Sequence, residues 1–175
     1  MIRLRSLVSG FFCVLSLLIT SQAAVVTAAP LQQLVETIEI NRPAGEVWAL
    51  LRDFDALRWH PRVKDVQLIR GSNGRIGAVR SVSMRDAPAY SDELVSYQDK
   101  SMSYRYRTLA SPWPIDHYDA TLSVQPHGKR SRVTWRASYV PRPQLIDGSA
   151  ADVRLILQAL QHDGLRNLKR LAEGS

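Results

Sequence analysis

Three tyrosines have the residue type and the spacing to contact a bound molecule. Tyr104 and Tyr106 are two residues apart in an alternating segment, and Tyr118 lies in the next alternating segment. Alternate residues of a strand project to the same face of a sheet, so we expect these rings to point inward together. Tyrosine rings stack on apolar ligands, and their hydroxyls offer hydrogen bonds. The other interpretation is ordinary packing of core aromatics.

Arg80 and Asp92 are residues of opposite charge on two successive predicted strands. They could form an exposed ion pair, or a buried pair that orients a carboxylate or hydroxyl of a ligand. Burial would be informative because a buried charge is costly unless it is paired. Asp92 with Tyr104 or Tyr118 could also transfer protons, since acid–base catalysis requires only positioned side chains. The sequence alone assigns a catalytic role to no residue.

Other chemistries lack the residues that they require. The glycine-containing segment 71–77 has neither the lysine nor the following helix of a phosphate-binding loop, and no G-x-S-x-G nucleophile elbow occurs. The histidines are scattered without the spacing of a zinc-binding helix. They are His60, His117, His127 and His162. We therefore expect no metal, no cofactor and no nucleophile-based hydrolase activity.

The pattern of apolar residues predicts an α+β fold. Strands are expected at 34–40, 63–70, 76–84, 91–98, 102–108, 117–125 and 132–140. Two short helices are expected after the first strand, one capped by Asn41 and one that contains Leu57 and Trp59 and ends at Pro61. The predicted architecture is a seven-stranded antiparallel curved sheet with a long C-terminal helix across it.

The C-terminal helix is predicted at 150–171 and has one apolar face. Measured from Val153 at about 100° per residue, that face comprises Ile156, Leu157, Leu160, Gly164, Asn167, Leu168 and Leu171, while Arg154, Gln158, Gln161, Arg166 and Arg170 lie opposite. A helix laid across a curved sheet can leave a cavity. We expect Leu157, Leu160, Gly164 and Asn167 to line it. Gly164 would leave space for a ligand or a close strand, and Asn167 would either cap a local backbone group or form a hydrogen bond with a ligand.

Loops and tryptophans are expected at the rim of this cavity. Proline-bearing loops are predicted at 86–89 and 111–114, and Trp113 lies in the second of them. Trp59 is a further candidate ligand contact, whereas Trp135 is assigned to packing. A tight hairpin is expected at 71–74, because Gly71 and Gly74 accept the positive φ that such turns require.

Four arginines are expected on the outer face of the sheet. Arg105 and Arg107 alternate on one strand and Arg132 and Arg136 on another, and the strand 117–125 is expected between them. They form either a solvated surface or a docking patch for an acidic redox protein or an anionic lipid. Association through such a patch would weaken steeply with salt.

The first 28 residues have the pattern of a secretory signal peptide. Arg3 and Arg5 precede an apolar run at 7–19, and small residues lead to an expected cleavage after Ala28. Cys13 would be removed, so residues 29–175 would form a single domain without disulfides. The whole chain has 23 Lys and Arg against 16 Asp and Glu. A periplasmic or secreted basic protein favours anionic partners but not nucleic acid.

Several short motifs together resemble the START/SRPBCC superfamily, near its bacterial polyketide cyclase/dehydrase-like members. They are PAGEVW at 43–48, WHP at 59–61, GRIGAVR at 74–80, YDATL at 118–122 and VTW at 133–135. The resemblance implies a helix-grip fold with a hydrophobic cavity between sheet and long helix. It also implies that Arg80 and Asp92 lie near that cavity. With the export signal, the pattern is also similar to the small periplasmic accessory proteins of methanol oxidation.

Three hypotheses for function follow. The first is an exported, non-enzymatic protein that binds a hydrophobic or aromatic small molecule or a lipid in the cavity. The second is a periplasmic accessory protein for a redox enzyme, such as a methanol dehydrogenase system, that binds through the arginine face. The third is a cyclase- or dehydratase-like enzyme, which requires a perturbed carboxylate in the cavity.

Overall fold

The structure is a computed structural model that describes residues 29–142 and 150–174. The predicted signal peptide at 1–28 therefore lies outside the described residues. In chain order the elements are β1 (Gln32–Ile40), α1 (Ala44–Ala49), β2 (Val63–Arg70), β3 (Val79–Met84), β4 (Tyr90–Gln98), β5 (Ser103–Ala110), β6 (Ile115–His127), β7 (Arg130–Pro141) and α2 (Ala150–Glu173).

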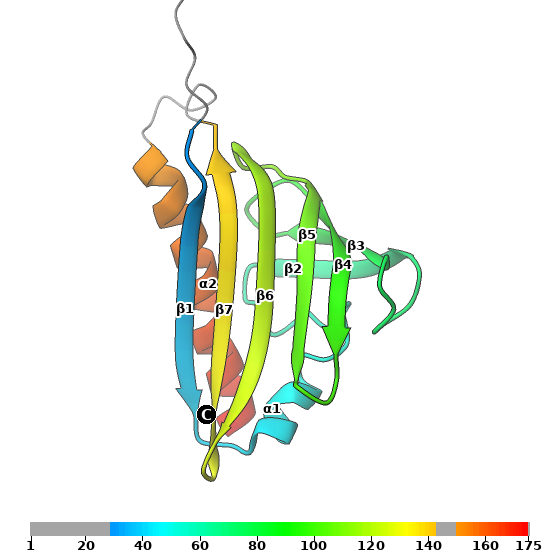
Figure 1. The fold of residues 1–175 in the computed structure, drawn as a ribbon, viewed down its shortest axis with the longest axis vertical. Helices are drawn as coiled ribbons and strands as arrows, with labels where there is room; N and C mark the ends of the chain where they lie inside the picture. The colour runs from blue at the N-terminus through cyan, green and yellow to red at the C-terminus, as the bar shows by residue number, and fades with distance from the viewer. Residues whose placement is uncertain (1–28, 143–149, 175) are drawn as a thin grey trace, which may run out of the picture.

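The strands form one seven-stranded sheet in the order β1-β7-β6-β5-β4-β3-β2. All neighbouring strands are antiparallel. The sheet curves strongly, and α2 runs along its inner face behind β1 and β7 (Figure 1). This arrangement confirms the predicted α+β helix-grip architecture.

The region between α1 and β2 differs from the prediction. Only α1 forms, and residues 51–62 run through successive turns instead of a second short helix. Buried Phe54 and Trp59 anchor these turns in the core, so tertiary packing overrides the helical spacing. Asn41 does not cap α1, because Pro43 occupies the cap position without a side-chain hydrogen bond. The Asn41 backbone N–H instead donates to the Glu173 carboxylate at 2.7 Å.

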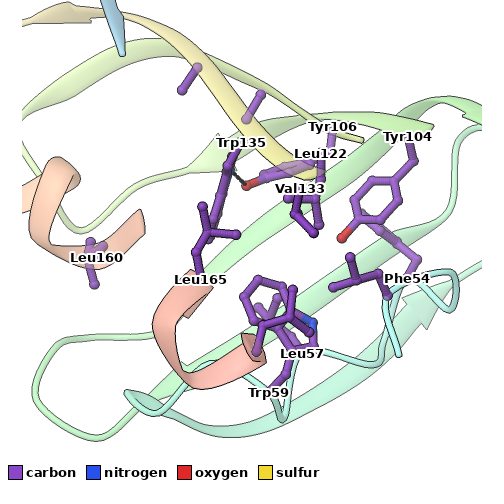
Figure 2. Packing of buried hydrophobic residues seen from close by; sticks show 14 of the residues in the cluster. Phe54, Leu57, Trp59, Tyr104, Tyr106, Leu122, Val133, Trp135, Leu160 and Leu165 are labelled. Carbon is purple, nitrogen blue, oxygen red and sulfur yellow. Dashed lines mark hydrogen bonds between the residues drawn. The ribbon is translucent and has the colours of Figure 1, made fainter. Parts of the chain in front are cut away.

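An aromatic core fills the space near α1. The Phe54 ring meets Tyr104 edge-on at 6.0 Å between centroids and Tyr106 at 6.4 Å. Trp59 packs edge-on against Trp135, whose indole N–H donates to the Tyr106 hydroxyl at 3.1 Å (Figure 2). Burial of such large rings supplies much of the stability of a domain this size.

Basic side chains of α2 hold the helix against the edge of β1. The Arg154 guanidinium donates to the Gln33 carbonyl at 2.9 Å, and the Lys169 ammonium donates to the Glu39 carbonyl at 2.7 Å. These bonds satisfy carbonyls of an edge strand that has no strand partner on that side. They also fix the position of α2 above the sheet.

The buried face of α2 is rotated from its predicted position. Gln161 and Leu165 are buried, whereas Ile156 and Leu171 are substantially exposed. The buried stripe therefore lies roughly 45° from the predicted one. The prediction was confirmed for Val153, Leu157, Leu160, Gly164 and Leu168. It was wrong for Ile156, Leu171 and Gln161, which were assigned to a side of the helix by their polarity.

Candidate functional site

A cavity lies between the inner face of the sheet and the N-terminal half of α2. Its volume is about 40 Å³, and most of its wall is aromatic or aliphatic. The lining side chains are His60, Met84, Tyr90, Asp92, Tyr106, Thr108, Ser111, Trp113, Ile115, Tyr118, Trp135, Leu157, Leu160 and Gln161. They come from β3 to β7, α2, the β5–β6 loop and the turns before β2.

The predicted hollow is therefore present, but it is small. A water molecule needs roughly 10–15 Å³ of such volume, whereas pockets for drug-sized ligands measure about 300–1,000 Å³. A cavity of about 40 Å³ has room for a few water molecules. An aromatic ligand would have to displace part of the wall.

Arg80 and Asp92 form a buried ion pair at this cavity. They face each other in the register of β3 and β4, and their side chains are 2% and 0% exposed. The guanidinium donates to one Asp92 oxygen at 3.1 and 2.9 Å and to the Phe54 carbonyl at 2.8 Å. Thr108 donates to the other Asp92 oxygen at 2.7 Å. Of the two alternatives that the sequence left open, the structure shows the buried pair.

Burial and the neighbouring groups shift the pKa of Asp92 in opposite directions. Burial raises the pKa of the Asp92 carboxyl, while Arg80 and the Thr108 hydroxyl counteract that rise. The Arg80 guanidinium also lies over the Phe54 ring at 4.2 Å and the Tyr106 ring at 4.9 Å. Such cation–π contacts replace part of the hydration that Arg80 loses on burial. The pair is thus a compact, internally satisfied unit.

Tyrosine hydroxyls at the cavity are in their protonated form. Burial raises the pKa of Tyr118 to about 12, although the nearby Gln161 amide opposes the rise. Burial likewise raises the pKa of Tyr90 and of Tyr106 above the ordinary tyrosine value. At neutral pH these groups are therefore neutral hydrogen-bonding hydroxyls.

His60 is a neutral structural side chain in the cavity wall. Its Nδ1 accepts from the Arg62 backbone N–H at 3.3 Å, so Nε2 carries the proton and donates to the Leu160 carbonyl at 3.0 Å. Burial lowers the pKa of His60 to about 4. With both ring nitrogens bonded, this histidine ties α2 to the turns before β2.

Gln161 is a polar lining residue that was not among the predicted ligand contacts. Its side chain lines the cavity and is 1% exposed, yet neither amide atom has a hydrogen-bond partner in the described residues. The amide lies near the Tyr118 hydroxyl without a well-formed bond. A signal existed in the spacing, because Gln161 is four residues from both Leu157 and Leu165.

About half of the predicted ligand contacts line the cavity in the structure. Asp92, Tyr106, Trp113, Tyr118, Leu157 and Leu160 line it. Trp113 forms part of the rim and packs against Tyr90 with 5.4 Å between ring centroids. Thr108 and Ser111 also line the cavity; the first shares the alternation of Tyr106, and the second lies in the predicted rim loop.

The other predicted contacts lie outside the cavity lining. Arg80 lies behind Asp92 and Tyr106, which separate it from the cavity, and Tyr104 packs against Trp48 and Phe54. Trp59 and His60 fill the space beside Gly164, where an added Cβ would lie 2.7 Å from the His60 ring. The Asn167 amide donates to the Trp59 carbonyl at 2.7 Å, so its partner is a backbone group, but one distant in the sequence and not the local group that was expected.

The outward arginines share a face but are mostly neutralised. Thr121 faces both Arg105 and Arg136 in the strand register, so the two arginines flank it across β5, β6 and β7. Three of the four arginines form ion pairs: Arg105 with Asp119 at 2.6 Å, Arg107 with Glu93 at 2.7 Å and Arg132 with Glu39 at 2.7 Å. Arg136 has no ion pair among the described residues.

Within residues 29–142 and 150–174, no group of three or more His, Cys, Asp or Glu side chains is arranged to hold a metal ion. No helix in these ranges is both long and apolar enough to cross a membrane.

Comparison with known structures identifies the same fold. An uncharacterised protein from Bacillus thuringiensis superposes with a TM-score of 0.71 at 23% identity, covering 81% of this chain and 98% of that one. The protein XoxI from Bacillus cereus gives 0.70 at 23% identity, covering 79% and 94%. A protein from Thermobifida fusca gives 0.67 at 27% identity, covering 80% and 92%. No curated protein matches the sequence.

The sequence itself carries a family match over most of its length. Residues 32–173 match the family model described as polyketide cyclase / dehydrase and lipid transport. That range includes every strand, α1, the cavity and all of α2. The chain belongs to the polyketide cyclase/dehydrase and lipid transport family.

Proposed function

We propose that this protein is a non-enzymatic binding module for a small hydrophobic or aromatic molecule or a lipid. The observation that carries the proposal is the mostly apolar cavity between the sheet and α2. Such a cavity, lined by rings and a few polar groups, is the usual form of a small-molecule site. The family description, which includes lipid transport, supports the same class of ligand.

The state of the polar groups favours binding over acid–base catalysis. Asp92 is bonded to Arg80 and Thr108, and both nitrogens of His60 are bonded. The raised pKa of Tyr118, about 12, makes its hydroxyl a poor base at neutral pH. A cyclase- or dehydratase-like reaction would need one of these groups to exchange a proton with a substrate. The cavity offers orientation and burial instead.

Ligand entry requires movement at the rim, because the cavity of about 40 Å³ is smaller than an aromatic ring. Trp113 and Tyr90 pack together there, and both side chains are partly exposed. Their displacement would open the cavity without disturbing the buried pair of Arg80 and Asp92. We therefore assign to the rim the conformational change that accompanies binding.

Export completes the proposal. The mature protein would begin at Ala29 and act in the periplasm or outside the cell. Expression of the full chain in a Gram-negative host, with N-terminal sequencing of the periplasmic product, tests this directly. Retention of residues 1–28 on a cytoplasmic product would contradict it.

Native mass spectrometry of the purified protein tests the binding function. We expect a noncovalent small-molecule adduct or, after extraction, a recovered hydrophobic compound in stoichiometric amount. Leu160→Trp should abolish the adduct because its indole would occupy the cavity. Leu155→Trp, on the exposed side of the same helix, should retain it. Bare protein in the wild type, or an adduct unaffected by Leu160→Trp, would contradict the proposal.

Docking to an acidic redox protein or an anionic lipid surface is the second candidate function. The observation that favours it is the placement of Arg105 and Arg136 across the outer face. Of the four arginines of this patch, Arg136 alone lacks an ion pair within the described residues, so the patch presents little net charge. Arg136→Glu should weaken a salt-dependent association strongly if this face binds the partner. An unchanged affinity would remove the candidate.

A further inference from the structure

Gln161 stands out because a buried, unpartnered amide is costly. Its side chain is 1% exposed, and both amide atoms lack hydrogen-bond partners in the part of the chain that the structure describes. Native proteins satisfy nearly all buried polar groups, so each exception needs an explanation. Folding alone does not provide one here. Leucines at 157 and 165 occupy the neighbouring buried positions of α2, and a leucine would fit the same stripe.

Most of the other polar groups of the cavity are already engaged. Asp92 accepts from Arg80 and Thr108, and the Tyr106 hydroxyl accepts from Trp135. The Ser111 hydroxyl bonds the Trp113 backbone. Gln161 is therefore the main group with hydrogen-bonding capacity left for a ligand, beside the Tyr90 and Tyr118 hydroxyls, which also line the cavity.

We propose that Gln161 selects ligands that carry a hydrogen-bond donor and acceptor side by side on an apolar body. This inference rests on the proposed function. A glutamine amide presents one carbonyl acceptor and N–H donors in one plane. A primary amide, a lactam or a protonated carboxylic acid complements it with two parallel hydrogen bonds. A ketone satisfies only the donor side, and a hydrocarbon satisfies neither.

A competing account is that water alone satisfies the amide. The cavity of about 40 Å³ has room for it. The two accounts differ in what a guest must provide. If water keeps its hydrogen bonds to Gln161 when a ligand binds, removal of the amide will change the affinity for polar and apolar ligands alike. If the ligand makes these hydrogen bonds, the change in affinity will be confined to ligands with the paired donor and acceptor.

Three probes of similar size separate these accounts: benzamide, acetophenone and isopropylbenzene. Their dissociation constants would be measured by protein-observed NMR titration of wild type, Gln161→Met and Gln158→Met. For Gln161→Met we expect about tenfold weaker binding of benzamide, as for the loss of buried hydrogen bonds. Acetophenone should weaken less, and isopropylbenzene should bind unchanged or more tightly. Gln158→Met alters an exposed position of the same helix and should change none of them.

Each outcome decides a separate claim. Equal benzamide affinity in wild type and Gln161→Met, with isopropylbenzene still bound, would overturn the role of Gln161 and leave the binding function intact. Failure of all three probes to bind the wild type would overturn the proposed function and this inference together. Should Gln161→Met not fold, Gln161→Leu provides the same comparison. The unfolding midpoint of each variant would be measured first.

Discussion

The buried pair of Arg80 and Asp92 leads to a sharp prediction about stability. Arg80→Met keeps an apolar stem of similar length but removes the guanidinium. The Asp92 carboxylate would then be buried with only the Thr108 hydroxyl as partner, and the Phe54 carbonyl would lose its donor. Removing one partner of a buried pair typically costs about 3–5 kcal/mol. We expect the free energy of unfolding to fall by that amount at pH 7.

Urea denaturation followed by tryptophan fluorescence measures this loss. Arg107→Met is the matched control, since it breaks an ion pair with Glu93 in which the arginine side chain is 57% exposed. That control should cost less than about 1 kcal/mol. The double variant Arg80→Met/Asp92→Leu should be more stable than Arg80→Met alone, because it removes the uncompensated charge.

The pH dependence of the stability of Arg80→Met is a second test of the buried pair. In Arg80→Met, burial without the guanidinium raises the folded pKa of Asp92 above its unfolded value. The folded state then holds a proton that the unfolded state releases, so stability falls as pH rises through that window. The difference between Arg80→Met and wild type should therefore be smaller at pH 4 than at pH 7. A loss below about 1 kcal/mol at pH 7, or a double variant no more stable than Arg80→Met, would refute the reasoning.

Two further predictions concern the contact between α2 and the turns before β2. The pKa of His60 is about 4 in the folded protein, against an ordinary value of 6.5, so between these pH values the unfolded protein binds a proton that the folded protein does not. The free energy of unfolding should therefore fall by on the order of 3 kcal/mol between pH 7 and pH 4. In urea titrations, His60→Gln should remove this pH dependence. Gly164→Ala places a Cβ 2.7 Å from the His60 ring and should lower the free energy of unfolding by about 1–3 kcal/mol. The control Gly45→Ala adds a Cβ with nothing within 4 Å and should be neutral or slightly stabilising. Equal effects of the two variants would contradict the close packing at Gly164.

Local rules predicted the sheet closely because they act within each strand. The strand at 63–70 forms over those residues, and Gly71 and Gly74 adopt positive φ in the connection that follows. That connection is longer than the predicted tight hairpin, because β3 begins at Val79 and not at Ile76. The alternation of Tyr104 and Tyr106 gave the correct face. The alternation could not show which of the two inward rings lines the cavity. Tyr104 packs beside Trp48 and Phe54, whereas Tyr106 also lines the cavity.

The candidate site was less predictable because it depends on contacts between distant segments. The pairing of β3 with β4 places Arg80 opposite Asp92, but their burial also requires Thr108 and the Phe54 carbonyl. Irregular pairing between Asp116 and Asp119, with positive φ at His117, sets the local path of the strand at Tyr118. Gln161 was misplaced because polarity usually marks the solvent face, and a ligand site is where that rule fails.

The central claim, that the space between the sheet and α2 is a ligand site, is tested most directly by NMR titration with isopropylbenzene. The account predicts saturable one-to-one binding, with the largest shifts at the methyl groups of Met84, Ile115, Leu157 and Leu160. Leu160→Trp should eliminate those shifts while remaining folded. Spectra of the wild type that stay unchanged up to the solubility limit of isopropylbenzene, and that also stay unchanged with benzamide and acetophenone, would contradict it.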